Sequence, residues 1–193
     1  MEKHTRINHD FGYFLNPEKY VPIANQNDES FAALKLGLIL ENYLSTYITN
    51  VRAAGTEGYI KDSRYFTPKL EICVALGLPV SIADAFKAFN NIRNKFAHRL
   101  EYQMTDVDID ELKDKVNAIS KDEVNFNNYF NDNINTLFDV GVDSIALLHN
   151  LPVNIDPKKH RVIKLTATAF ALSNKGAFHI INKLDSLKKL NVS

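Results

Sequence analysis

The chain has a single cysteine, Cys73, so an internal disulfide framework is excluded. Its neighbours Ile72, Val74 and Ala75 are apolar, and we expect a small buried residue rather than a nucleophile. The sequence also lacks a phosphate-cradling glycine loop, a nucleophile motif and an internal repeat. These absences leave few segments in which chemistry can be sought.

An excess of charge of either sign is also missing, since 23 basic residues balance 23 acidic ones. A dedicated nucleic-acid-binding domain usually has a basic face, so strong sequence-independent RNA binding is not expected. The middle of the chain is acidic and its end is basic. The basic end is either a solvated face, the lining of an RNA groove or a contact for an acidic partner: Lys158, Lys159, Arg161, Lys164, Lys175, Lys183, Lys188 and Lys189.

No apolar run is long enough for a membrane span, because the richest stretch, residues 31–40, is interrupted by Lys35. The first ten residues are polar and charged, which predicts no secretory signal. We therefore expect a cytoplasmic protein without membrane contact. The length and the 45% apolar content predict one helical domain over residues 28–193, preceded by an extended or looped segment at residues 1–27.

Apolar residues recur at steps of three and four, which predicts an all-α fold with six or seven helices. Asp28 or Ser30 should begin a long helix, and Thr67 and Gly77 should begin and end a short one. The expected apolar face of the long helix consists of Phe31, Leu34, Leu38, Ile39, Tyr43, Leu44, Tyr47 and Ile48.

Later helices are indicated by cap signals and apolar spacing. Asp108 and Glu111 suggest a capping box, and Asp156 followed by proline suggests a helix through Leu172. Residues 162–170 alternate enough that a strand remains an alternative. A further apolar pattern is Phe130, Ile134, Leu137, Phe138, Val142, Ile145 and Leu148.

The segment 90–99, Asn-Asn-Ile-Arg-Asn-Lys-Phe-Ala-His-Arg, continues a helix for which Ser81 is the expected N-cap. Arg93 falls beside the apolar stripe of this helix, where an arginine is rarely left without a carboxylate, a phosphate or a partner subunit. Asn94 and His98 share a face. Arg93 and His98 diverge by about 140°, so one regular helix does not aim both at one atom. The stripe is Ile82, Ala85, Phe86, Phe89, Ile92, Phe96, Ala97 and Leu100.

Three successive helices carry a family resemblance. The first ends in Leu-Glu-Asn-Tyr-Leu, the second contains Phe-Thr-Pro-Lys-Leu and Ala-Leu-Gly-Leu, and the third holds Ile-Arg-Asn-Lys-Phe-Ala-His. This order, over roughly residues 28–120, resembles the HEPN superfamily and, within it, the mannitol operon repressor (MltR-like) branch. The resemblance implies an up-and-down helical bundle that forms a homodimer, with two such motifs facing each other across a two-fold axis. Arg93, Asn94 and His98 match the pattern of the ribonuclease members.

RNA cleavage without a metal needs a base for the 2′-hydroxyl, an acid for the leaving 5′-oxygen and a cation for the developing charge. An imidazole exchanges protons near neutral pH, and a guanidinium presents a planar fork to phosphate. His98 and Arg93 are therefore the predicted catalytic pair, with Asn94 orienting the phosphate or an imidazole. Lys95 and Arg99 are the predicted RNA contacts, and no cofactor is expected.

Two functions remain open at this point. One is a metal-independent endoribonuclease of the toxin or defence type, with an antitoxin or regulator as protein partner. The other is a non-catalytic transcriptional regulator that acts through protein–protein contacts, since no helix-turn-helix with a basic recognition helix is evident. In that case Arg93, Asn94 and His98 would only fix an interface by buried polar contacts.

The remaining histidines do not predict a metal site. His4 and His9 lie in a polar N-terminal segment without regular spacing. His149, His160 and His179 have no carboxylate at the helical spacing of a zinc or di-iron motif, and we expect them at the surface or the core edge.

Overall fold

Every regular element in the described part of the chain is a helix. The structure, a computed structural model, describes residues 11–124, 142–149, 151–152 and 154–190. The all-α prediction is confirmed for these residues, and none of their helices is long and apolar enough to cross a membrane. Within these residues several additional helices of only four residues are present, so the number of helices exceeds the predicted six or seven. The elements are α1 (Gly12–Leu15), η1 (Pro17–Lys19), α2 (Val21–Ala24), α3 (Glu29–Val51), α4 (Phe66–Ala75), α5 (Val80–His98), α6 (Asp106–Asn117), α7 (Lys121–Val124), η2 (Val142–Ser144), α9 (Ala146–His149) and α10 (Pro157–Ser186).

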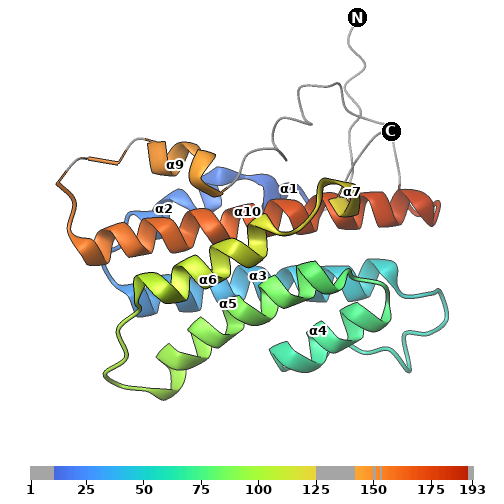
Figure 1. Cartoon of the computed structure of the whole chain (residues 1–193). Coiled ribbons are helices and arrows are strands. Elements are labelled where there is room, and N and C mark those ends of the chain that lie inside the picture. The colour runs from blue at the N-terminus through green and yellow to red at the C-terminus, as the bar shows by residue number, and fades with distance from the viewer. Residues whose placement is uncertain (1–10, 125–141, 150, 153, 191–193) are drawn as a thin grey trace, which may run out of the picture.

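The two longest helices, α3 and α10, lie side by side and run in the same direction (Figure 1). Arg161 near the start of α10 binds Glu29 at the start of α3, and Gly176 farther along α10 accepts a hydrogen bond from Tyr43 in α3. Figure 1 shows α5 running against α3 and α6 running with it. The up-and-down order therefore holds for α3, α5 and α6, whereas α10 runs parallel to α3.

Three of the predicted helix boundaries are confirmed. The Asp28 carboxylate accepts hydrogen bonds from the first free backbone amides of α3, and Asp156 does the same for α10. Gly77, just after α4, has a φ of +96°, the left-handed conformation that glycine adopts without a steric penalty. These local signals depend on a few neighbouring residues, which is why the sequence shows them.

Three other predicted caps are wrong. Helix α5 begins at Val80, and the Ser81 hydroxyl donates to the Glu123 carboxylate at 2.7 Å instead of capping the helix. Helix α4 begins one residue before Thr67, which lies in its first turn. The capping box of α6 pairs Thr105 with Asp108, not Asp108 with Glu111. For Ser81, the hydrogen bond to a residue distant in sequence replaces the local hydrogen bond that an N-cap would make.

The N-terminal segment and α10 also differ from expectation. Residues 11–27 form α1, η1 and α2 rather than an extended segment, and Phe11, Phe14 and Tyr20 are buried in the common core. Helix α10 includes the alternative strand at 162–170 and continues well beyond Leu172. The predictions that concern residues 1–10 and the apolar residues Phe130, Ile134, Leu137 and Phe138 fall outside the described part of the chain.

The buried face of α3 is rotated relative to the predicted one. Phe31, Leu34 and Leu38 are 45%, 39% and 58% exposed. The rest of the predicted face is buried, and the core positions near the helix start are taken by small or neighbouring residues: Ala32, Ala33, Leu36 and Leu40. Since α10 packs on one side of α3 and α5 on another, an apolar ridge is left facing outward.

The basic end of the chain serves the fold. Lys159 Nζ donates to the carbonyl oxygens of Ala24 and Gln26 at the C-terminal end of α2, and Lys189 Nζ donates to that of Arg52 after α3 at 2.6 Å. Lysine ammonium groups satisfy carbonyls that a helix C-terminus leaves without partners. Arg161 likewise binds Glu29, and Lys175 donates to the carbonyls of Val116 and Ile119. These four side chains have partners within the chain, which disfavours for them the alternative in which the basic end lines an RNA groove.

Close contact between α3 and α10 depends on Gly176. The Tyr43 hydroxyl donates to the Gly176 carbonyl at 2.9 Å, and the Tyr43 ring is stacked on Phe86. A Cβ atom at position 176 would lie 2.9 Å from the ring atom Cζ of Tyr43. That distance is below van der Waals contact, and the fully buried ring has no open space into which it can move.

Gly176→Ala should therefore destabilise the protein by about 2 kcal/mol, although an exposed helical glycine normally gains stability on this change. Gly12→Ala is the matched control, because nothing lies within 4 Å of a Cβ there. Chemical denaturation of both variants measures the effect. Equal stability of Gly176→Ala and wild type would contradict the close contact.

His179 is buried in the core, so its predicted position at the surface or core edge is wrong. Its ring stacks on Tyr47, and Nδ1 lies 3.1 Å from the Glu123 carbonyl oxygen of α7. Burial lowers the pKa of His179 from 6.5, opposed by the Glu123 hydrogen bond and assisted by the nearby Lys183 charge. Cys73 is buried as predicted, and burial raises its pKa to about 12.

The lowered pKa of His179 predicts a pH-dependent stability. The unfolded chain takes up this proton near pH 6.5 and the folded chain only at lower pH. The contribution of neutral His179 to the free energy of unfolding is thus complete above about pH 6.5. It is lost as the pH falls, by at most about 1.4 kcal/mol per pH unit. Compared with wild type, His179→Phe should lose less stability between about pH 7 and about pH 5. Identical pH dependence of the two unfolding free energies would refute this prediction.

Candidate functional site

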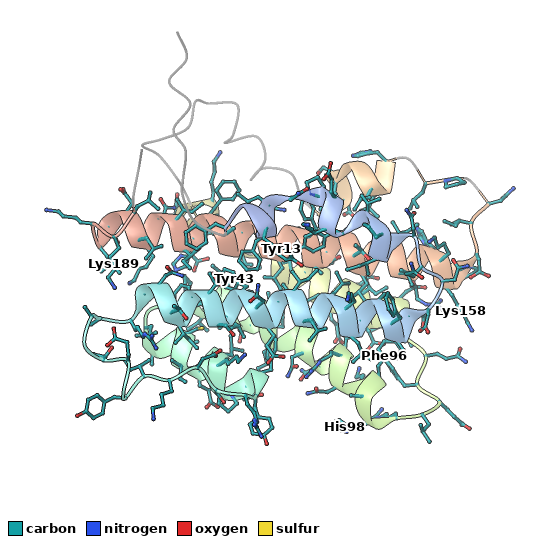
Figure 2. The ribbon with its side chains drawn as sticks, turned by 180° about the vertical axis from the view of Figure 1, so that it is seen from behind. Tyr13, Tyr43, Phe96, His98, Lys158 and Lys189 are labelled. Atoms are coloured by element: carbon teal, nitrogen blue, oxygen red, sulfur yellow. The ribbon has the colours of Figure 1, made fainter. Side chains whose placement is uncertain are left out.

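The motif residues lie on the last two turns of α5. The helix is regular through His98 and ends where Arg99 becomes extended, with φ −130° and ψ 105°. Figure 2 shows His98 at the far end of α5, away from the α3–α10 pair. The N-terminal part of α5 is held by its apolar stripe, and Phe96 is half-buried. The last two residues of the predicted stripe, Ala97 and Leu100, are exposed.

Arg93 points toward α3. The side chain passes so close to Gly37 that a Cβ atom added there would lie 3.3 Å from Arg93 Cγ. The Nη2 atom of Arg93 lies 3.9 Å from Glu41 Oε2. Of the three kinds of partner considered for Arg93, a carboxylate, a phosphate or a second subunit, the chain itself supplies a carboxylate, but 3.9 Å is too long for a hydrogen bond. Glu41 is held more closely by Lys69, at 3.2 Å. The Arg93 side chain is 29% exposed, so its guanidinium is held only loosely by the fold.

Asn94 and His98 face a different direction, into an open groove of about 640 Å³ between α5 and α6. The predicted RNA contacts Lys95 and Arg99 also line this groove, whereas Arg93 does not. The divergence expected from helical geometry is therefore present in the structure. Within one chain, the arginine and the histidine of the motif are not brought together.

The groove contains residues that the sequence analysis missed. Lys87 and Asn91 precede Asn94 and His98 at steps of four, three and four residues, so the four side chains share one face of α5. This polar stripe is a signal that the sequence alone contains. Lys115 completes the groove from α6, and its position could not be inferred because it depends on the packing of two helices.

The charges of the groove nearly cancel. Its basic side chains are Lys87, Lys95, Arg99 and Lys115, and its acidic ones are Asp84, Asp108 and Glu111. Lys95 is already paired with Asp108, so it could bind RNA only by leaving that partner. Arg99 is exposed and remains a predicted RNA contact. A groove of this kind suits a bound phosphate at a few positions rather than a long polyanion.

Asp108 holds the chain after His98 in place. Its carboxylate accepts hydrogen bonds from Lys95, from the Tyr102 hydroxyl at 2.7 Å and from the Thr105 backbone amide at 2.9 Å. Burial alone would raise the pKa of Asp108, but these hydrogen bonds outweigh it and keep the pKa well below its usual value. Tyr102 also packs edge-on against Phe96. One carboxylate thus fixes the turn between α5 and α6.

His98 has an exposed side chain that makes no hydrogen bond or ion pair with the described residues. Asn94 is half-buried at the groove. In the same part of the chain, no group of three or more histidine, cysteine or acidic residues is placed to hold a metal ion.

Comparisons of the chain with protein-family models, with curated proteins and with solved structures found no match. The assignment of a function therefore depends on the site itself and on the residues that carry the HEPN resemblance.

Proposed function

We propose that the protein is a metal-independent endoribonuclease of the HEPN type, a cytoplasmic toxin or defence effector whose site is completed by a second copy of the chain. The observation that carries this proposal is the exposure of His98, whose side chain makes no hydrogen bond or ion pair with the described residues. A histidine kept only for packing or for buried contacts would be enclosed by the chain, as His179 is. His98 is instead open to a substrate or to a second subunit.

The need for a second copy follows from the geometry. Arg93 lies against Gly37 on the α3 side, and His98 lies in the groove on the α6 side. Between them, α5 presents Asn94 and the small exposed residue Ala97. A second α5 that approaches this face across a two-fold axis would place the Arg93 of one chain near the His98 of the other.

The chemistry uses both copies. One His98 takes the proton of the RNA 2′-hydroxyl, and the freed oxygen attacks the adjacent phosphorus. The bond to the 5′-oxygen breaks, and that oxygen receives a proton from the partner's His98. Arg93 offsets the charge that develops on the phosphate oxygens, and Asn94 orients the phosphate. The products are a 2′,3′-cyclic phosphate and a 5′-hydroxyl.

The groove between α5 and α6 would then guide the RNA strand. Lys87, Lys115 and Arg99 are exposed along it and can each reach a phosphate, whereas Asp84 and Glu111 limit the overall attraction. We expect RNA binding that weakens only modestly with salt, because it depends on a few phosphate contacts. A target would be selected by its shape near the cut rather than by general affinity.

The test is incubation of the purified protein with a mixed RNA pool in the presence of EDTA, with 2′,3′-cyclic phosphate ends as the readout. Light scattering of the same sample reports whether it is a dimer. New cyclic phosphate ends from a dimer support the proposal. A folded dimer that leaves RNA intact overturns it in favour of the alternative, a non-catalytic transcriptional regulator that acts through protein–protein contacts. The near-neutral charge of the groove is what favours that alternative.

A further inference from the structure

A second surface of the molecule, separate from the groove at His98, has the form of a docking site. Phe31, Leu34 and Leu38 form an exposed apolar ridge along the first half of α3. Their spacing of three and four residues places them on one helical face over about 10 Å. Exposed apolar residues are ordinary when scattered, but a continuous row of them marks a surface that becomes covered.

Beside this ridge lies an open hollow of about 360 Å³ between α3 and the segment that contains α1, η1 and α2. Figure 2 shows Tyr13 between α1 and α3, on the side of the molecule seen from behind. Phe31 and Leu38 form one wall of the hollow, and Tyr13 and Pro22 contribute to the other. A groove beside a helical ridge is the shape that receives the apolar face of another helix.

The charges at this hollow have one sign. Lys19 and Lys35 line it, both side chains are exposed, and the lining includes no carboxylate. Lys19 lies over the Tyr13 ring at 5.6 Å, and Lys35 has no ion pair within the described residues. The chain as a whole carries equal numbers of acidic and basic residues, so the positive charge of this hollow is local.

We propose that this hollow binds an amphipathic helix of a partner protein, with large apolar side chains on one face and carboxylates beside them. The apolar face would cover Phe31 and Leu38, and the carboxylates would pair with Lys19 and Lys35. A hollow with walls favours inserted side chains over a flat membrane surface. The inference is independent of RNA cleavage, because none of the residues involved belongs to the proposed site.

The probe is a fluorescein-labelled helical peptide of about 18 residues, with leucine and phenylalanine on one face and glutamate on both flanks. A second peptide carries lysine in place of each glutamate. Fluorescence anisotropy should give a Kd for the acidic peptide on the order of 10 μM and at least about tenfold weaker binding for the basic one. Leu38→Glu and Lys35→Glu should each weaken the acidic peptide by about tenfold or more.

Tyr59→Glu is the control variant, because Tyr59 is 91% exposed in the loop after α3 and lies outside the hollow. It should bind the acidic peptide as wild type does. The proposal fails if neither peptide binds, if both bind equally or if Tyr59→Glu weakens binding as much as Leu38→Glu. It also fails if the protein sediments with phosphatidylcholine–phosphatidylglycerol vesicles through Leu38, or if Leu38→Glu converts a wild-type dimer to monomers.

Discussion

His98→Ala should lower metal-free RNA cleavage by at least about 10³-fold while leaving the free energy of unfolding within about 0.5 kcal/mol of wild type. In the proposed reaction, one copy of His98 is the base and the other copy is the acid. The substitution therefore removes both groups from the site at once. Loss of a proton-transfer group usually costs about 10²–10⁴-fold, and the exposed imidazole makes no hydrogen bond or ion pair to the described residues.

A matched control exists in His149, an exposed histidine that ends α9 as His98 ends α5. His149→Ala should retain full cleavage activity. Counting of cyclic phosphate ends and chemical denaturation of the same preparations separate the two effects. If His98→Ala unfolds more easily than His149→Ala but cleaves RNA normally, His98 is a structural residue and the catalytic assignment is wrong.

Asp108→Asn should destabilise the protein by about 3 kcal/mol. The carboxylate side chain is only 9% exposed and receives hydrogen bonds from Lys95 in α5 and from Tyr102 and Thr105 in the turn after it. An asparagine has only one acceptor oxygen and places an amide beside at least one of these donors. The Lys95 ammonium would then be left without its counter-charge.

The matched control is Asp110→Asn on the same helix. Asp110 is 53% exposed and pairs with Lys113 at 3.5 Å, so its loss should change stability by less than about 0.5 kcal/mol. Denaturation midpoints of the two variants should differ clearly. Similar midpoints would show that the hydrogen bonds around Asp108 do not hold the turn.

Acid titration provides an independent test of Asp108. Its folded pKa lies below the usual value of 3.8, so its contribution is present above about pH 4 and is lost as the pH falls through the folded pKa. Wild type should lose more stability than Asp108→Asn over this acidic range. The His179 contribution disappears at higher pH, so the two effects can be distinguished on one curve.

Much of the local structure could be predicted from the sequence. The starts of α3 and α10 and the end of α4 follow from Asp28, Asp156 and Gly77, because each signal acts on backbone groups a few residues away. The divergence of Arg93 and His98 follows from helical geometry. The polar stripe that joins Lys87 and Asn91 to His98 is also present in the spacing of the sequence.

The failures have a common cause in long-range packing. Ser81 binds Glu123 across more than 40 positions of sequence, and the lysines of α10 reach carbonyls at the ends of α2, α3 and α6. No window of neighbouring residues contains such a partner. For the same reason, charge patterning made the C-terminal segment look available to RNA when half of its basic side chains serve the fold.

The sequence by itself determined that the chain is helical, where its main helices begin, and that Arg93, Asn94 and His98 share the end of one helix, since these properties arise from spacing and local hydrogen bonding. Only the tertiary structure decided which side of each helix is covered. Packing of α10 and α5 on α3 left Phe31, Leu34 and Leu38 outside, and packing of α6 on α5 gave His98 a groove and Arg93 a different neighbour. Burial is a property of the whole assembly of helices, because a face becomes interior only when another helix lies against it.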